Sequence, residues 1–469
     1  MSNQYDLLII GAGVSGSALL YLTTKYTDIQ HIGVIEKYSA PARVNSLSSN
    51  NSQTLHCGDI ETNYTLEKAL KVQRAASMLR NYAVAQPDAH HIIFKYSKMV
   101  LGVGAKECEL LKERFKVFGP HYPHLKLLDK KAIARIEPNV ALKNEKFRED
   151  EIVALGSTDE YTAVNFEALS RSFVRQAEIE ASLHPEKSID LHYNEYVDHI
   201  KIDKSGFIIE TNGVCYRTKA LVVCAGGHSL KLAHDMGYGH HYSVLPIAGS
   251  YYFTPHLLNG KVYTVQNDAL PFAAIHGDPD VLVPGATRFG PTALVLPILE
   301  RYNLKTLPDF LQVFRFDGRV AKVLWDLLKV ADIRNYMFKN MLFEIPIIRK
   351  VLFLKDVRKI IPSLKLGDLK FANKVGGIRP QLIDKDHCKL LMGEAKIDTG
   401  IGGIFNMTPS PGGTSCIENA EIDMRTIVKH LGATIDEDAL QKDLLVDDVQ
   451  HDSNDFAGVV ISGEDAVKH

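Results

Sequence analysis

A glycine-rich turn near the start of the chain constrains its fold more than any other feature. An apolar run at residues 7–10 is followed by the hexapeptide GAGVSG at 11–16 and then by residues of helix-forming composition. This order predicts a strand, a tight turn and a helix. Gly11 would allow the turn, Gly13 would let a pyrophosphate approach the backbone, and Gly16 would let helix and strand pack closely. The helix N-terminus would then face the phosphates.

An acidic residue follows at the spacing that a dinucleotide-binding fold requires. A second apolar strand is predicted over residues 32–35, and it ends in Glu36, twenty positions after Gly16. A carboxylate there accepts hydrogen bonds from ribose hydroxyls and disfavours a 2′-phosphate. The glycine triplet alone is also compatible with a plain loop between strand and helix. The strand, the helix and the acid together favour dinucleotide binding, and they leave NAD and FAD open.

Later segments predict a return to this first sheet. Residues 195–218 alternate around a turn and indicate a small antiparallel meander, and an apolar strand at 220–224 then ends in the small residues Ala225 and Gly226. Short runs between 245 and 283 indicate a second, largely antiparallel sheet in which a substrate chamber could form. We therefore expect an α/β fold, in which a Rossmann-type FAD-binding or NAD-binding domain is interleaved with a substrate domain of antiparallel sheet and helices. The expected segments are 1–66, 161–235 and 373–435 for the nucleotide-binding domain, 67–160 and 236–372 for the substrate domain, and 436–469 for a loose acidic tail.

Composition narrows the function classes. The formal net charge of -2 gives no general attraction to nucleic acid. The six cysteines are scattered without a C-x-x-C pair, so neither a zinc site nor a disulfide framework is indicated. The first residues lack the basic start and cleavage site of a signal peptide, and no apolar run has the length of a membrane-spanning helix. We expect a cytoplasmic enzyme that does not bind nucleic acid.

Five short motifs give the chain a more specific signature. They are NSQTLH at 51–56, ETNYT at 61–65, PFAAIH at 271–276, GPTA at 290–293 and TPSPGGTS at 408–415. Together they resemble the FAD-dependent D-amino-acid oxidase and L-2-hydroxyglutarate oxidase superfamily, specifically its malate:quinone oxidoreductase branch, and the resemblance covers nearly the whole chain. The NYT triplet is similar to the malate branch, whereas the histidine-to-GP segment is similar in both branches.

This resemblance implies that the cofactor is FAD. Relatives often carry glycine at position 53, where this chain has Gln53, so the contact of that loop with the flavin is left open. Backbone N–H groups of the late turn would stabilise charge on the reduced flavin ring. The implied FAD-binding residues are Gly11, Gly13, Gly16, Glu36 and Lys37 on the ADP half, Val197 at the adenine, Ala225 and Gly226 at the pyrophosphate, Asn51 and Ser52 beside the ring, and Gly412, Gly413 and Thr414 at its pyrimidine end.

Oxidation of a 2-hydroxy acid needs a base for the hydroxyl proton and cations for the carboxylates. His276 is the predicted base, since an imidazole accepts a proton near neutral pH, and its alternative is a structural histidine. Arg379 is the predicted carboxylate clamp, and its alternative is a surface salt bridge. His56 and Tyr252 are weaker candidates that could simply pack. Arg288 would clamp the second carboxylate of a diacid, or it is a surface charge.

A basic segment indicates contact with lipid. Residues 301–370 contain fifteen Lys or Arg and seven Asp or Glu, an excess near +8 in a nearly neutral chain. The apolar run at 351–354, flanked by basic residues, is the sharpest candidate for entering a membrane interface, and an ordinary solvated face is the alternative. We thus predict a dehydrogenase that converts malate to oxaloacetate, passes electrons to a membrane quinone, and binds peripherally to the cytoplasmic face of the inner membrane. An L-2-hydroxyglutarate dehydrogenase or oxidase, a non-catalytic flavin-binding protein and a nicotinamide-linked dehydrogenase are the alternatives.

Overall fold

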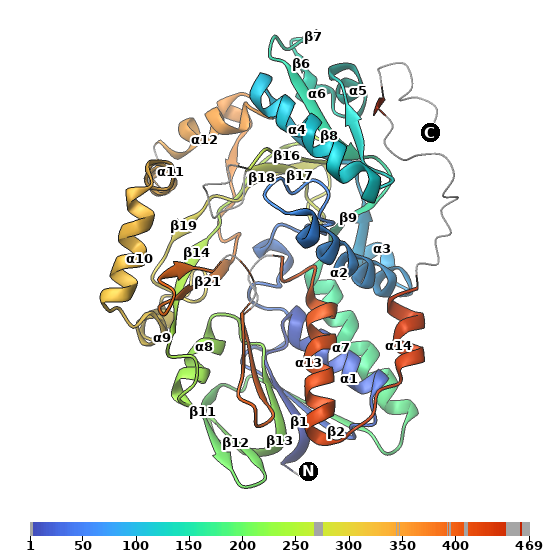
Figure 1. The fold of residues 1–469 in the computed structure, drawn as a ribbon, viewed down its shortest axis with the longest axis vertical. Helices are drawn as coiled ribbons and strands as arrows, with labels where there is room; N and C mark the ends of the chain where they lie inside the picture. Colours follow the sequence, from blue (N-terminus) through green and yellow to red (C-terminus); the bar gives the residue numbers. More distant parts are fainter. Residues whose placement is uncertain are drawn as a thin grey trace.

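The fold was analysed in a computed structural model, which describes residues 3–266, 275–343, 345–346, 348–391, 393, 395–407, 411–446 and 460–461. Two of the quoted motifs extend past these ranges, because residues 271–274 and 408–410 lie outside the described residues. The chain builds two layered halves, one around a largely parallel sheet and one around a largely antiparallel sheet (Figure 1).

The first half is organised by a sheet with a parallel centre. Its strands are β1 (Gln4–Ile10), β2 (His31–Glu36), β10 (Ser188–Tyr193), β11 (Val197–Asp203), β12 (Gly206–Thr211), β13 (Cys215–Val223), β23 (Ala395–Asp398) and β24 (Gly403–Met407). The pairs β10–β2, β2–β1, β1–β13 and β13–β24 are parallel, while β11 and β12 form the predicted antiparallel meander. Central strands that are buried on both faces read as continuous apolar runs, and residues 7–9 of β1 are fully buried.

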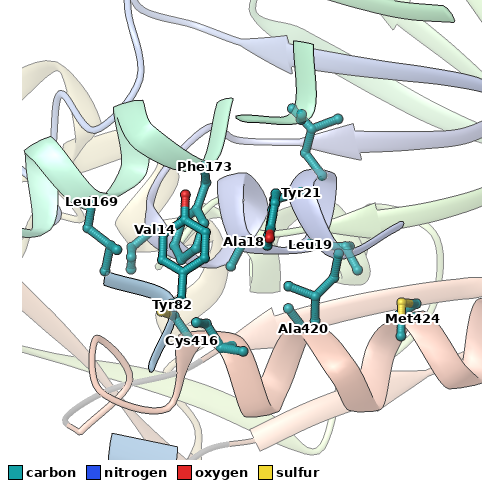
Figure 2. Packing of buried hydrophobic residues seen from close by; sticks show 14 of the residues in the cluster. Val14, Ala18, Leu19, Tyr21, Tyr82, Leu169, Phe173, Cys416, Ala420 and Met424 are labelled. Atoms are coloured by element: carbon teal, nitrogen blue, oxygen red, sulfur yellow. The ribbon is translucent and has the colours of Figure 1, made fainter. Parts of the chain in front are cut away.

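Helices cover this sheet and create the main hydrophobic core. They are α1 (Val14–Tyr26), α2 (Leu66–Val84), α3 (Ala89–Ile92), α7 (Phe166–Leu183), α8 (His228–Asp235), α13 (Cys416–Leu431) and α14 (Glu437–Leu444). Helix α1 is buried on nearly every side, as its apolar composition predicts. Figure 2 shows α1 residues such as Ala18 and Leu19 between α7 and α13, with Tyr82 of α2 closing the cluster. The ring of Phe173 lies 4.4 Å from that of Tyr82.

The second half is built on two further sheets. The larger one contains β4 (Lys98–Val103), β5 (Lys126–Leu128), β8 (Ile152–Ser157), β15 (Tyr252–Pro255), β16 (Lys261–Thr264), β17 (His276–Pro279), β18 (Ala286–Gly290), β20 (Lys370–Phe371) and β25 (Val460–Ile461). The smaller one contains β14 (Tyr242–Ala248), β19 (Leu294–Val295), β21 (Ile378–Asp384) and β22 (Lys389–Leu390). Pairing is antiparallel except between β16 and β4 and between β25 and β5.

The remaining helices flank these sheets. They are α4 (Ala105–Phe118), α5 (Lys130–Ile136), α6 (Pro138–Ala141), α9 (Leu307–Phe314), α10 (Gly318–Lys329), α11 (Ala331–Leu342) and α12 (Arg349–Val357). Helices α9 to α12 follow one another along one edge of the molecule (Figure 1). Short elements complete the fold: β3 (Ile93–Lys95) with β9 (Tyr161–Val164), β6 (Leu142–Lys143) with β7 (Lys146–Phe147), and the 3-10 turns at 48–50, 119–121, 304–306 and 366–368.

The first part of the segment 436–469, which was predicted to be a loose tail, is helical. Residues 437–444 form α14, whose Leu440 and Leu444 are buried in the main core. The Asp443 carboxylate pairs with Lys25 at 2.8 Å and accepts a hydrogen bond from Tyr26 at 3.1 Å. Leu440 and Leu444 are four residues apart, which places them on one face of the helix, and that face packs against α1 and α2. The acidic residues around them obscured this pattern in the sequence.

Candidate active site

A cavity opens where the parallel strands meet the second half of the molecule. Its wall contains the residues that follow β1, β2 and β13 and those at the facing ends of β14 and β21. Ligands of open α/β sheets bind at this end of the strands. The predicted residues that line the cavity are Gly11, Gly13, Glu36, Lys37, Asn51, Ser52, His56, Val197, Ala225, Gly226, Arg379, Gly412, Gly413 and Thr414. The predicted residues that do not line it are Gly16, Tyr252, His276 and Arg288.

The three glycines of the first turn have separate structural reasons. Gly11 has a φ of 99°, and a Cβ there would lie 2.6 Å from the carbonyl oxygen of Cys224. A Cβ at Gly16 would lie 1.9 Å from the oxygen of Gly11, so only glycine lets α1 pack on β1. At Gly13 the nearest atom would be Ser46 Oγ at 3.3 Å, which leaves the backbone accessible from the cavity. This turn fits a pyrophosphate at the N-terminus of α1.

Glu36 is fixed at the end of β2 by the backbone. Its carboxylate accepts hydrogen bonds from the N–H groups of Ala12 at 2.8 Å and Tyr38 at 2.9 Å. Burial raises the pKa of Glu36, and these two hydrogen bonds oppose the rise. The position suits contact with a ribose, so the turn and the acid together fit the ADP half of FAD. The neighbouring Lys37 also lines the cavity, but its ammonium group is paired with Glu300.

The loop beside the predicted flavin ring is held by its own side chains. Asn51 donates hydrogen bonds to the carbonyl oxygens of Asn45 at 3.1 Å and Leu47 at 2.9 Å. Gln53 has a φ of 52°, which explains why glycine suits this position, and its side chain is buried. The Gln53 amide donates to the Ser48 oxygen at 3.0 Å and accepts from the Val281 N–H at 3.1 Å. Glutamine therefore offsets the strained backbone by tying this loop to the second half of the molecule.

His56 lies on the cavity wall with a carboxylate behind it. Its backbone N–H donates to Thr414 Oγ1 at 3.0 Å, which joins the two loops at the ring end. Its Nδ1 lies 2.7 Å from Glu61 Oε1, and the two side chains are 15% and 9% exposed. Burial alone would raise the pKa of Glu61, but the hydrogen bond and charge of His56 and the charge of Lys98 lower it. Glu61 was not among the predicted site residues, although it stands in the ETNYT motif five residues after His56.

Arg379 and Tyr251 face the same end of the cavity. Arg379 stands on β21, opposite Ile247 of β14, and its guanidinium forms no ion pair with any described acidic side chain. Tyr251 is buried, and burial raises the pKa of its hydroxyl although Arg288 and Arg379 oppose the rise. A protonated phenol and an unpaired guanidinium form an anion-binding wall.

Tyr252 was predicted for the site, and the structure corrects that prediction. Successive residues of a strand point to opposite faces, so Tyr251 lines the cavity while Tyr252 points away from it. The Tyr252 ring stacks on Phe353 at 4.0 Å and meets Phe371 edge-on at 5.4 Å. Tyr252 is therefore a core residue of the substrate domain, and the neighbouring Tyr251 was missed.

His276 belongs to a buried polar cluster one residue behind the cavity wall. Its Nε2 lies 3.1 Å from Asp278 Oδ2, and its ring stacks on Tyr263 with centroids 4.3 Å apart. Asp278 also pairs with Lys261 at 3.2 Å, and Lys261 reaches Thr54 Oγ1 at 3.3 Å. Thr54 lines the cavity, so it stands between this cluster and the ring end. The prediction that His276 contacts substrate directly is not supported by this geometry.

The charged side chains of this cluster shift one another's pKa values. Burial would raise the pKa of Asp278, but the charges of His276, Lys261 and Arg288 hold it well below its usual value. Burial lowers the pKa of Lys261, and Asp278 partly opposes that effect. Arg288 is fully buried, 3.4 Å from Asp280, with its guanidinium carbon 4.5 Å from the centroid of the Tyr251 ring. The predicted alternative of a surface charge is thus wrong for Arg288.

The fold and the site together define a class of protein. A Rossmann-type turn with its acid, a cavity running to a second antiparallel half and a late glycine turn are the architecture of an FAD-dependent oxidoreductase. Solved structures agree on this fold. An L-α-glycerophosphate oxidase from Mycoplasma pneumoniae with FAD bound superposes with a TM-score of 0.59 at 18% identity, covering 92% of this chain and 96% of that one. A glycine oxidase from Geobacillus kaustophilus gives a TM-score of 0.61 at 14% identity over 91% and 95%.

The sequence comparisons are more specific. The family model for malate:quinone oxidoreductase (Mqo) matches residues 3–401. A probable malate:quinone oxidoreductase of Campylobacter jejuni is 48% identical over 95% of this chain and 100% of its own length. A malate:quinone oxidoreductase of Helicobacter pylori strain 26695 is 43% identical over 96% and 100%. The chain belongs to the malate:quinone oxidoreductase family, which uses FAD to oxidise malate with quinone as the electron acceptor. The hydroxyglutarate, nicotinamide and non-catalytic alternatives are not favoured.

Proposed function

We propose that (S)-malate is oxidised to oxaloacetate at the ring end of this cavity with His56 as the general base. When bound, FAD supplies the acceptor for the hydride that leaves C2 of the substrate. The observation that carries the proposal is the position of His56 on the cavity wall, with Nδ1 held 2.7 Å from Glu61. That contact fixes the imidazole and leaves Nε2 to accept the hydroxyl proton, while the Glu61 carboxylate stabilises the imidazolium that forms.

Arg379 is the proposed clamp for the carboxylate next to the alcohol carbon. A guanidinium binds a carboxylate through two parallel hydrogen bonds, and Arg379 has no described acid competing for it. The second carboxylate of malate would meet the Tyr251 hydroxyl. Arg288 supports that contact from behind the Tyr251 ring rather than by touching substrate. His276 is proposed to position Thr54 and Tyr263 through the buried cluster.

An anaerobic substrate screen tests the proposal. Purified holoprotein is mixed with L-malate, D-malate or L-2-hydroxyglutarate, and flavin absorbance near 450 nm is followed. Fast bleaching by L-malate alone supports the proposed substrate and stereochemistry. Bleaching by L-2-hydroxyglutarate at an equal or higher rate would overturn them.

We also propose peripheral binding to the cytoplasmic face of the inner membrane through helices α9–α11. The predicted contact at 351–354 holds only in part, because Phe353 packs against Phe343 and Tyr252 and Leu354 is also buried, whereas Val351 is 56% exposed. No helix in the described part of the chain is both long and apolar enough to cross a membrane. Helices α9–α11 form one edge of the molecule (Figure 1), and large apolar side chains of this segment are exposed. They include Leu311, Phe316, Trp325, Phe338 and Met341, each more than half exposed.

Charge complementarity selects the partner of this apolar edge. Arg319, Lys322 and Lys329 are each at least 60% exposed beside it; Arg319 pairs with Asp386 and the two lysines share Asp326, so the three cations exceed the acids that they pair with. They lie within the basic segment 301–370. Exposed aromatic and aliphatic side chains with basic neighbours suit an anionic bilayer surface. The edge also adjoins the site, because the Ala293 N–H on the cavity wall donates to Asn340 of α11 at 2.7 Å.

Vesicle sedimentation tests this surface. The double variant Trp325→Ala with Phe338→Ala should lose most binding to vesicles that contain phosphatidylglycerol, and raised salt should weaken binding of the unchanged protein. Leu183→Ala is the matched control, since Leu183 is 67% exposed at the end of α7, in the other half of the molecule. Equal loss in the control, or unchanged binding of the double variant, would refute the assignment.

A further inference from the structure

A row of buried ionisable side chains leads from His56 toward the surface. Behind His56 stands Glu61, and the same loop carries Asp59, which is 2% exposed. Lys98, at the start of β4, lies 2.8 Å from Asp59 and 3.1 Å from Glu160. The Glu160 side chain, in the turn between β8 and β9, is 24% exposed. The row therefore begins at the cavity wall and ends at solvent.

The middle of the row contains polar atoms that the fold leaves unsatisfied. Asp59 Oδ1, Glu61 Oε2 and the Tyr122 hydroxyl are buried without a hydrogen-bond partner among the described residues. The charges of both carboxylates act on the Tyr122 hydroxyl, so the three groups are neighbours. An unsatisfied buried polar atom costs about 1–3 kcal/mol. Three together are hard to explain as a structural device, since apolar residues would fill the same space at less cost.

The proposed reaction leaves a proton in the active site that must be released. Each hydride that leaves malate takes both electrons to the flavin, and the hydroxyl proton stays on His56 Nε2. His56 must lose a proton before the next turnover, and its Nδ1 hydrogen faces Glu61. Loss of that hydrogen leaves Nε2 protonated, and a turn of the imidazole ring then returns His56 to its starting tautomer. We propose that Glu61, Asp59, Lys98 and Glu160 form the path by which this proton reaches solvent. The inference rests on the proposed role of His56 and adds the exit route.

The charges of the row set where a proton rests. The pKa of Glu61 is lowered overall, so Glu61 stays ionised at rest, stabilises the imidazolium and holds a proton only in passing. Burial raises the pKa of Asp59, with Glu160 and Glu61 adding to the rise and Lys98 opposing it. A proton that reaches Asp59 is therefore held more readily than on Glu61. Burial would lower the pKa of Lys98, but the charges of Asp59 and Glu160 raise it well above its usual value. Lys98 thus stays an ammonium, and it passes a proton by releasing one to the partly exposed Glu160 and taking one from Asp59.

The test separates flavin reduction from proton release. Holoenzyme in weak buffer with a pH-indicator dye is mixed anaerobically with malate in a stopped-flow instrument. Flavin bleaching and dye colour are followed in the same reaction. In the unchanged protein the two signals should coincide. In Glu160→Gln the flavin should bleach at a near-normal rate, while the dye signal should lag about tenfold or more, because the path to solvent is broken.

Controls keep the outcome interpretable. Asp159→Asn removes the neighbouring carboxylate, which is 82% exposed and pairs with Lys95 outside the row, and it should show no lag. Asp59→Asn breaks the path at its centre and should lag like Glu160→Gln, with equal FAD content showing that the site is intact. Synchronous release in both row variants would overturn the proton path alone. Failure of malate to bleach the unchanged protein would instead reject the proposed function.

Discussion

Two histidines of this protein each carry a carboxylate partner, and they differ in where they can act. His56 lies on a loop at the cavity wall, is 15% exposed and contacts Glu61 at 2.7 Å. His276 lies on strand β17, is 3% exposed and contacts Asp278 at 3.1 Å. Lys261 shares the second carboxylate, whereas no lysine or arginine of the described residues pairs directly with the first. Both pairs join a histidine to a carboxylate, but only His56 lies where a substrate can contact it.

The difference shows that the distance from a side chain to the substrate decides whether it can be the catalytic base, before its pKa matters. A general base must come within hydrogen-bonding distance of the proton that it removes. His56 satisfies this requirement from a functional loop, while Thr54 and Tyr263 stand between His276 and the cavity. An enclosed ion cluster stabilises the fold and positions its neighbours. Substitution should therefore mainly change the reaction rate at His56 and the stability of the protein at the Asp278 cluster.

The largest expected effect separates the two histidines by rate. His56→Asn should slow anaerobic flavin reduction by malate about 10²- to 10⁴-fold, because the hydroxyl proton loses its acceptor. His276→Asn should slow it less than about tenfold, because His276 acts only through its neighbours. Stopped-flow bleaching measures both rates, and FAD content checks that the cofactor site is intact. The comparison breaks if His276→Asn proves the slower variant.

The second effect separates the two pairs by stability. Lys261→Met leaves Asp278 buried without its ammonium partner, and uncompensated buried charges cost about 3–5 kcal/mol. Urea unfolding should show this loss. Lys322→Met is the control, since Lys322 forms an exposed pair with Asp326, and it should leave the free energy of unfolding unchanged. An unchanged midpoint for Lys261→Met would contradict a structural role for the cluster.

The nucleotide half of the site could be predicted because its signals are local. The strand, the turn and the helix that position Gly11 and Gly13 lie within one short segment, and Glu36 follows at the end of the next strand. Each glycine answers a steric requirement of the backbone itself. The meander at 197–211 followed from alternation in the same way.

The ring end could be predicted only in part, because it depends on register and on distant contacts. Tyr251 and Tyr252 are adjacent, and one position decides which of them faces the cavity. The contact between His56 and Glu61 depends on a loop conformation that no periodicity shows. The burial of Arg288 depends on the pairing of β18 with both β15 and β17, which places it in the middle of a sheet and which the residues around it do not indicate.

The third prediction tests whether the His56 side of the cavity is where the substrate binds. Arg379→Met should weaken malate binding about tenfold to hundredfold, since a charged hydrogen-bond donor is lost. Titration of the flavin spectrum with a non-reducing dicarboxylate measures the dissociation constant. Arg319→Met, which alters an exposed pair with Asp386, is the matched control. Equal affinities for both variants would remove Arg379 from the site.

The smallest expected effect is a pH dependence that is present on the His56 side and absent on the His276 side between about pH 4.5 and pH 7.5. The pKa of Asp278 is lowered in the folded protein, so its interactions stabilise the fold at pH values above its unfolded pKa of about 3.9. This stabilisation is lost as the pH falls through the folded pKa. The folded pKa of Asp59 is raised, so its contribution is present below about pH 4 and is lost as the pH rises through the folded value. Asp59→Asn should therefore gain about 1 kcal/mol relative to the unchanged protein between about pH 4.5 and pH 7.5. Asp278→Asn should be destabilised by a constant amount over that interval, because Asp278 stays ionised throughout. Urea unfolding at both pH values measures the two differences, and a parallel trend in the two variants would mean that the two histidine pairs do not differ in the electrostatics of their surroundings.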